Sequence, residues 1–261
     1  MNDFPIGVFD SGVGGLSVLK HIRELLPQEH LYYVADSANA PYGNKSDIEI
    51  QIRSDLITRF LLGHNIKALV VACNTATAAA IEKLRSDFDL PIIGMEPAVK
   101  PAALMTQSGV VGILATPGTI ASQKYAKLYQ QYAANVTIIS QPCVGLVEQV
   151  EMADLTGAQT RALIDKYVAS LLKQNVDTLV LGCTHYPFLK SLIEEIAGEG
   201  VSVIDTGGAV AKELRRKLEQ ADLLNKGDNQ GEVHFWSNSE KAHQVVDQLW
   251  DTKLTKNKLD I

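Results

Sequence analysis

Two cysteines in matching surroundings are the side chains of this sequence best suited to chemistry. Cys73 lies in IKALVVACNT (66–75) and Cys183 in VDTLVLGCTH (176–185), so each ends an apolar run of strand length and precedes small polar residues. A thiolate is a strong nucleophile and base, and the free backbone N–H groups at a helix N-terminus stabilise its negative charge. For a single cysteine, buried apolar filler is the alternative. The repeated context favours a pair of reactive thiols.

Small polar residues follow both thiols and recur in three other segments. The candidates for tuning a thiol or binding an anionic ligand are Asp10, Ser11, Tyr42, Gly43, Asn74, Thr75, Thr116, Thr119, Thr184 and His185. Their carboxylate, hydroxyl, amide, imidazole and backbone groups can move a proton or orient a small substrate. Ordinary roles compete, because Asn and Thr often cap helices and Asp and Ser often form turns. The residues alone leave both interpretations open.

Other potential sites receive less support from the sequence. Cys143 follows Pro142 and precedes an apolar stretch, so we interpret it as a core residue. The turn DSGVGGLS has G-x-G-G spacing, which differs from the G-x-G-x-x-G of dinucleotide-binding folds. The six histidines are scattered and none stands at zinc-ligand spacing, so we expect no metal. No lysine lies in a convincing pyridoxal motif, so we also expect no organic cofactor.

Short apolar runs alternate with amphipathic stretches of helix length. The predicted strands are 6–9, 31–35, 68–72, 91–93, 110–114, 136–140, 178–181, 201–204 and 233–236. The predicted helices are 16–26, 47–62, 75–88, 118–132, 156–173, 187–197 and 239–249, and residues 252–261 are expected to form a loosely held tail. Strands that are apolar on both faces and separated by helices indicate mainly parallel sheets flanked by helices. The predicted fold class is therefore α/β.

The repeat of the cysteine segments predicts two pseudo-symmetric domains. We expect residues 1–97 plus 208–261 to form one α/β domain and residues 98–207 the other. In parallel sheets, ligands bind outside the carboxyl ends of the strands, where both cysteines are predicted to lie. The active site is therefore expected in the cleft between the two domains.

Composition and charge limit the possible partners. Hydrophobic residues make up 46% of the 261 residues and the formal net charge is −6. An acidic chain is a poor match for nucleic acid, and its apolar runs are too short to cross a bilayer. The N-terminus lacks the basic and apolar regions of a signal peptide, and three cysteines are too few for a disulfide framework. We expect a cytoplasmic protein with reduced thiols that binds neither nucleic acid nor membranes.

Taken together, the motifs resemble the glutamate racemase family. FDSGVGGLSVL, PYG, ACNTATA, GMEPAVKPA, LATPGT and GCTHYP occur in that family's order and spacing, and the match runs from Ile6 to about Trp236. Related aspartate racemases usually carry other residues at the positions of Thr77 and His185. The resemblance implies a cofactor-independent enzyme that interconverts L- and D-glutamate by proton transfer between two cysteines and the substrate.

The resemblance also implies roles for individual residues. Cys73 would remove the α-proton of D-glutamate and Cys183 that of L-glutamate, while Asp10 and His185 would tune Cys73 and Cys183 respectively. The other eight candidates would bind substrate: Ser11, Tyr42, Gly43, Asn74, Thr75, Thr116, Thr119 and Thr184. Thr184 and His185 would bind it together, as would Asp10 and Ser11.

Further expectations follow from the same resemblance. An acidic residue near the site falls on Asp36, and another falls on either Glu148 or Glu151, which the sequence does not distinguish. A homodimer is expected, as is a role in supplying D-glutamate for bacterial peptidoglycan. Some relatives carry an N-terminal extension linked to activation by a cell-wall precursor; the short segment before the first predicted strand makes this regulation unexpected here.

Two other functions stay open. An aspartate or hydantoin racemase would share the thiols and prefer a different side chain on its substrate. A small-molecule sensor with a two-lobed cleft would bind glutamate without exchanging its α-proton.

Overall fold

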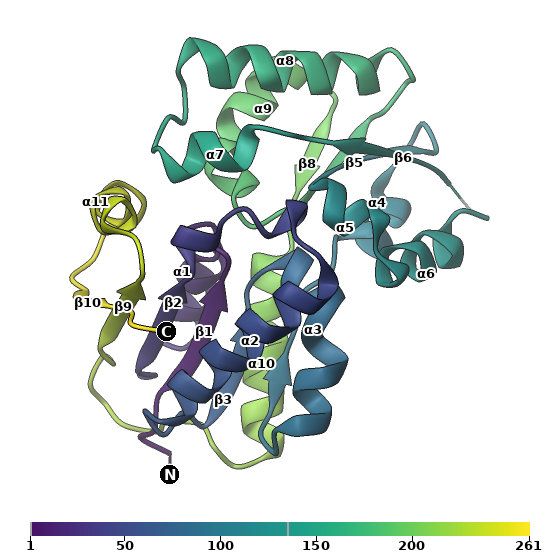
Figure 1. The fold of residues 1–261 in the computed structure, drawn as a ribbon. Coiled ribbons are helices and arrows are strands. Elements are labelled where there is room, and N and C mark those ends of the chain that lie inside the picture. Colours follow the sequence, from purple (N-terminus) through teal and green to yellow (C-terminus); the bar gives the residue numbers. More distant parts are fainter. Residues whose placement is uncertain (1, 135) are drawn as a thin grey trace.

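Two parallel β-sheets organise the protein, and the computed structural model describes residues 2–134 and 136–261 (Figure 1). The first sheet contains β1 (Ile6–Asp10), β2 (Leu31–Ala35), β3 (Ala68–Val71), β4 (Ile92–Ile93), β9 (Val233–Ser237) and β10 (Thr255–Lys258). Its strand order is β10-β9-β2-β1-β3-β4. The second sheet contains β5 (Val110–Ala115), β6 (Thr137–Pro142), β7 (Thr178–Gly182) and β8 (Ser202–Ile204), in the order β6-β5-β7-β8. Every described strand pair is parallel, which confirms the predicted fold class.

Helices cover each sheet, and each sheet with its helices forms one of two lobes (Figure 1). Around the first sheet lie α1 (Leu16–Leu25), α2 (Asp47–Leu62), α3 (Asn74–Asp87), α10 (Gly207–Gln220) and α11 (Glu240–Leu249). Around the second lie α4 (Val99–Met105), α5 (Pro117–Ala121), α6 (Gln123–Tyr132), α7 (Leu146–Glu151), α8 (Ala158–Leu172) and α9 (Lys190–Ala197). Short 3₁₀ turns are η1 (Ser37–Asn39), η2 (Tyr42–Asn44) and η3 (Tyr186–Leu189). We call the parts around the first and second sheets the first and second lobe, and keep the predicted residue boundaries of the domains as a proposal.

Both faces of the first sheet are buried because its strands carry apolar side chains in both directions. Phe9 and Leu69 belong to the core beneath α2 and α3, whereas Val8 and Val70 belong to the core beneath α1 and α10. Neighbouring residues of a strand point to opposite faces, so these continuous apolar runs require helices on both sides. Burying one such side chain contributes roughly 1.5–3 kcal/mol relative to leaving it exposed.

The order of the crossovers gives each lobe a point at which the strand order reverses. Strand β1 pairs with both β2 and β3, and β5 pairs with both β6 and β7. Since the chain leaves each central strand toward one neighbour and reaches the other neighbour later, the loops at the carboxyl ends of the strands separate there. Asp10 ends β1 and Cys73 follows β3; Thr116 follows β5 and Cys183 follows β7. Both thiols therefore lie beyond the carboxyl ends of the strands, where Thr184 of the second lobe donates to Asp10 of the first.

The amino ends of β5 and β7 are joined by a carboxylate. Asp177 accepts hydrogen bonds from Thr106 Oγ1 at 2.6 Å, Gln107 N at 2.7 Å and Ser108 N at 2.6 Å. Burial raises the pKa of this carboxyl, but the hydrogen bonds outweigh it and lower the pKa to about 2. Its charge thus fixes the turn that leads into β5.

Two predicted helices differ from the structure. The stretch 118–132 is broken at Ser122, whose backbone is extended (φ −72°, ψ 146°) and whose hydroxyl accepts from Tyr125 N at 3.1 Å to cap α6. The stretch 187–197 begins as the 3₁₀ turn η3, and its regular α-helix starts only at Lys190. Helices α4, α7 and α10 were not among those predicted by name.

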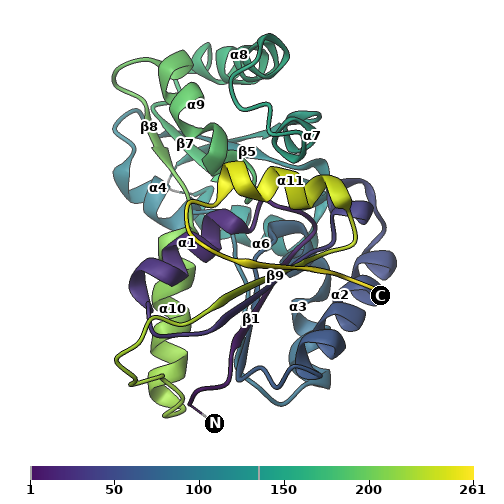
Figure 2. The same ribbon diagram turned by 90° about the vertical axis from the view of Figure 1, so that its left-hand side faces the viewer.

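The prediction of a loosely held C-terminal tail is wrong. Residues 255–258 form β10, which pairs with β9 at the edge of the first sheet, and Figure 2 shows the two segments side by side. Leu259 is only 2% exposed. Backbone hydrogen bonds and this one buried side chain hold the segment, so it needs no alternating apolar pattern. No helix within residues 2–134 and 136–261 is long and apolar enough to span a membrane.

Candidate active site

Cys73 is a buried thiol at the start of α3. It caps this helix, its Sγ accepts from Ala76 N at 3.4 Å, and it donates toward Ser11 Oγ at 3.8 Å. Burial and the negative charge of Asp10 raise the pKa of the Cys73 thiol well above its usual value, against the opposing effect of the Ala76 N–H. The N–H group at the helix N-terminus lowers this pKa as expected, but burial and Asp10 outweigh it.

Cys183 has a different neighbour. It follows β7 as predicted, but the next element is the 3₁₀ turn η3 and not the α-helix expected there. Its Sγ instead lies 3.7 Å from Nδ1 of His185. Cys73 and Cys183 are 5% and 7% exposed, so both thiols are buried.

His185 connects Cys183 to a carboxylate. Its Nε2 lies 2.7 Å from Glu151 Oε1. Burial alone lowers the pKa of His185, but the contacts with Cys183 and Glu151 raise it well above its usual value. A protonated imidazole can donate to both neighbours, Cys183 Sγ and Glu151 Oε1. Of the two glutamates left open by the sequence, Glu151 makes this contact.

Glu151 also joins the second lobe to the first. Its carboxylate accepts from Val13 N at 2.7 Å and from Ser37 Oγ at 3.0 Å. The glycines beside Val13 leave room for these side chains. A Cβ added at Gly12 would lie 2.7 Å from Glu151 Cδ, and one added at Gly14 would lie 2.6 Å from Cγ and Cε1 of His185. The glycine turn therefore leaves the space that His185 and Glu151 occupy. The spacing of the glycines in the sequence did not indicate this role.

Asp10 is fully buried and contacts both halves of the site. Its Oδ1 accepts from Ser11 N at 2.6 Å, and its Oδ2 accepts from Gly15 N at 2.6 Å and from Thr184 Oγ1 at 2.9 Å. Burial raises the pKa of Asp10, partly opposed by the charge of His185 and by hydrogen bonds. A carboxyl beside Cys73 with a raised pKa can accept and return a proton.

Three threonines form a hydroxyl cluster between the lobes. Thr75 Oγ1 lies 3.0 Å from Thr116 Oγ1 and 3.1 Å from Thr119 Oγ1. Thr75 belongs to α3, whereas the other two belong to the start of α5. Thr75 and Thr119 are 44 positions apart along the chain, so it is the fold that brings these three candidates together.

Asn74 has two buried polar atoms that a bound ligand could reach. Both its amide oxygen and its amide nitrogen are buried, and neither has a hydrogen-bond partner within the described residues. Leaving such groups unpaired costs roughly 1–3 kcal/mol each. A substrate with carboxylate and ammonium groups would satisfy both atoms, which favours a binding role over the helix-cap alternative.

Tyr42 and Asp36 form a structural group beside the site. The Tyr42 hydroxyl donates to Asp36 Oδ2 at 2.5 Å, and Arg53 donates to both oxygens of Asp36 at 2.8 and 2.9 Å. The phenol of Tyr42 is therefore used to hold its loop, and only its backbone is available for a ligand. Gly43 follows it and packs against Thr116 of the other lobe. Arg53, on α2, was not singled out by the sequence.

Cys143 stands apart from the paired thiols. It is buried in the apolar core, and its Sγ donates to Gln141 O at 3.3 Å. Burial raises the pKa of this thiol well above its usual value. This environment agrees with the interpretation as a core residue. Within the described residues no cluster of three His, Cys, Asp or Glu side chains suits a metal ion.

The family model described as Asp/Glu/Hydantoin racemase matches residues 6–214. The chain belongs to this family. The curated glutamate racemase of Ectopseudomonas mendocina is 56% identical over 237 residues, which cover 90% of each chain. The crystal structure of glutamate racemase isoform RacE1 from Bacillus anthracis matches with a TM-score of 0.91 at 32% identity, covering 100% of this chain and 99% of that one. Glutamate racemase from Francisella tularensis in complex with D-glutamate matches with a TM-score of 0.86 at 31% identity, covering 100% of this chain and 98% of that one.

Proposed function

We propose that this protein is a glutamate racemase that interconverts L- and D-glutamate by proton transfer between two thiols and the α-carbon. One observation carries the proposal: Cys73 and Cys183 end facing strands of two lobes, and each has its own polar partner. Asp10 accompanies Cys73, and His185 with Glu151 accompanies Cys183. The relatives at high identity and coverage, and the neighbour solved with D-glutamate, support the choice of substrate.

The two sides of the site suit opposite steps. His185, whose pKa is raised by its contacts with Cys183 and Glu151, can donate to the Cys183 sulfur, while burial and Asp10 raise the pKa of the Cys73 thiol. Cys183 takes the α-proton of L-glutamate, and the electron pair left on the α-carbon takes the proton of Cys73 from the opposite face. The product is D-glutamate, with the proton now on Cys183 and the charge on Cys73. The reverse reaction starts from this state, so each thiol serves as base in one direction and acid in the other.

The buried polar groups bind the substrate and spread the developing charge. The Asn74 amide, the threonine cluster and Thr184 offer donors to the carboxylates, joined by Ser11 and the backbone around Gly43. In a space closed to water these donors are worth more than in solution. Holding the α-carbon between two fixed thiols replaces the encounter of separate reactants.

We further propose that no metal or organic cofactor takes part, because the two thiols and their partners supply both a base and an acid. Dialysis against a chelator and treatment with a carbonyl reagent should leave the rate unchanged. Loss of activity that returns with one metal or with pyridoxal phosphate would refute this part.

The cellular context is proposed from the family. The protein would act in the cytoplasm as a homodimer and supply D-glutamate for peptidoglycan. Expression in a bacterial strain that needs external D-glutamate should restore growth without it. Sedimentation velocity should give the mass of two chains, and a single-chain mass at micromolar concentration would refute the dimer.

Circular dichroism of purified protein with L-glutamate tests the activity. The signal should decay to zero as the two enantiomers equalise, much faster than with L-aspartate or a hydantoin. Faster decay with aspartate would make the protein an aspartate racemase. Binding of glutamate without decay would refute catalysis and leave a sensor.

A further inference from the structure

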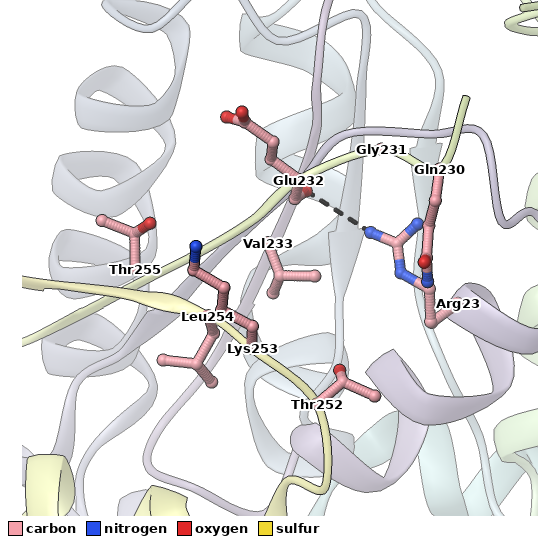
Figure 3. Close-up of a pocket in the computed structure, with 9 residues that line it drawn as sticks. All are labelled: Arg23, Gln230, Gly231, Glu232, Val233, Thr252, Lys253, Leu254 and Thr255. Atoms are coloured by element: carbon pink, nitrogen blue, oxygen red, sulfur yellow. Dashed lines mark hydrogen bonds between the residues drawn. The ribbon is translucent and has the colours of Figure 1, made fainter.

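A cavity of about 310 Å³ lies on the first lobe, away from the thiols (Figure 3). Arg23 near the end of α1, Val233 at the start of β9 and Thr255 at the start of β10 line it. The first sheet is parallel, so the amino ends of its strands share the edge opposite to the one that carries Asp10 and Cys73. The cavity is therefore separate from the candidate active site.

Arg23 brings an unused hydrogen-bond donor to this cavity. The residue is 7% exposed; its Nη1 donates to Pro27 O at 2.6 Å, and its Nη2 makes a long contact of 3.4 Å with Glu232 O. Its Nε is buried and has no partner within the described residues. In Figure 3 the edge of the guanidinium that carries Nε and Nη2 faces the lined space. Such an edge matches two oxygens of a carboxylate or phosphate.

Lys253 lies across the cavity from Arg23 (Figure 3). Within the described part of the chain it forms no ion pair. The pKa of Glu232 is lowered mainly by the hydrogen bond and charge of His234, and Lys253 adds a smaller effect. The Glu232 carboxylate points away from the cavity and lies 3.1 Å from His234 Nε2. The Thr252 hydroxyl adds a further donor to the lining.

Glu29, the buried carboxylate whose charge acts on Arg23, forms its ion pair with a different residue. Glu29 lies 2.5 Å from Lys67 Nζ and accepts from Asn225 N at 2.8 Å. Its charge is therefore already matched by a buried lysine. Burial lowers the pKa of Arg23 despite the opposing charge of Glu29, so an incoming anion would relieve the cost of burying the guanidinium. Arg23 and Lys253 thus place positive charge on two sides of the cavity.

We propose that this cavity is a second ligand site, which binds a small organic dianion between Arg23 and Lys253. A space of 310 Å³ fits a molecule of several carbon atoms, whereas an inorganic ion would fill only a small part of it. Dicarboxylates and phosphate monoesters share the required chemistry. The inference does not depend on racemase activity, since it rests on a different part of the molecule.

Isothermal titration with succinate, with glycerol 3-phosphate and with inorganic phosphate tests the site at low ionic strength. At least one of the two organic probes should bind with a dissociation constant below about 1 mM. Lys253 is exposed, so Lys253→Gln should leave the fold intact. It should weaken binding of that probe by about tenfold or more, since a charge-assisted hydrogen bond is lost. Arg23→Lys keeps the charge and removes the two-donor edge, so this substitution should weaken binding of the same probe to a similar extent. Lys173→Gln, an exposed lysine of the second lobe, is the matched control and should leave affinity unchanged.

The outcomes distinguish a carboxylate ligand from a phosphate ligand and show which results would overturn the proposal. Preference for succinate or for glycerol 3-phosphate identifies the anionic group. Binding of inorganic phosphate as tight as that of both organic probes would overturn the organic ligand. Binding that Lys253→Gln leaves unchanged belongs elsewhere, for example between the thiols, and overturns the site, as does the absence of binding by all probes. Should Arg23→Lys fail to fold, Lys253→Gln and Thr252→Val decide alone. None of these readouts uses turnover of glutamate.

Discussion

Replacing Gly14 by alanine tests whether the glycine turn positions the acid–base pair of Cys183. The new Cβ would lie 2.6 Å from Cγ and Cε1 of His185, whereas ordinary contacts begin at 3.4 Å. Nδ1 of His185 would lie closer still, so the imidazole or the turn must move by more than the 0.8 Å that separates these two distances. Such a shift disturbs both the 3.7 Å contact with Cys183 and the 2.7 Å contact with Glu151.

The expected effect is larger on catalysis than on folding. A misplacement near 1 Å costs on the order of 100-fold in rate, or about 2.7 kcal/mol of transition-state stabilisation. Overpacking a buried site costs about 1–3 kcal/mol of the free energy of unfolding. We expect Gly14→Ala to stay folded and to lose about 100-fold in kcat/KM, measured by circular dichroism with L-glutamate, with urea unfolding as the stability measurement.

Gly208→Ala provides the matched control. Gly208 lies in the first turn of α10, and the only atom near an added Cβ is His21 Nδ1 at 4.0 Å. Alanine there should keep kcat/KM and raise the free energy of unfolding by up to about 1 kcal/mol. Wild-type kcat/KM in Gly14→Ala would refute the positioning role, as would an equal loss in both variants.

Three further predictions concern the thiols, the histidine and a structural carboxylate. Cys73→Ser and Cys183→Ser should each lower kcat/KM at least about 100-fold, equally from L- and D-glutamate because the equilibrium constant between enantiomers in water is one; a variant with wild-type activity would remove that thiol from the mechanism. Glu151→Gln removes a contact that raises the pKa of His185, so the imidazolium is lost at lower pH and the basic limb of the pH profile of kcat/KM should move to lower pH; an unmoved limb would contradict this. Asp177 has a pKa lowered to about 2 in the folded protein, so it stabilises the fold above its unfolded pKa and this stabilisation is lost as the pH falls toward 2. Asp177→Asn should therefore lower the free energy of unfolding by about 1–2 kcal/mol at pH 7, and urea titrations should show the difference shrinking below pH 4.

The regular elements could be predicted where the signal is local. Helix α2 runs from Asp47 to Leu62 as expected, and Ser46 and Glu49 form a capping box at its start. Strand β2 also has its expected bounds. The break at Ser122 and the pairing of β10 escaped prediction because each depends on a choice that local propensity leaves open: a cap inside a helical pattern, and an edge strand stabilised by its neighbour.

The candidate site was predictable as a set of residues and not as a set of contacts. The position of Cys73 after its strand follows from the sequence, but its raised pKa depends on burial and on Asp10, which is 63 positions away along the chain. The choice of Glu151 over Glu148 likewise depends on which side of α7 faces His185. The steric role of Gly14 gave no signal beyond a turn, since it depends on a side chain from the other lobe.

Proton NMR of L-glutamate with the protein in deuterium oxide tests the two-thiol mechanism most directly. If Cys183 removes the α-proton and Cys73 delivers a solvent-derived deuteron to the opposite face, the first D-glutamate formed carries deuterium at the α-carbon. The L-glutamate that remains at that time should still carry its proton. D-glutamate that retains the original proton in early turnover would mean that one base returns it to the other face, and would contradict the mechanism.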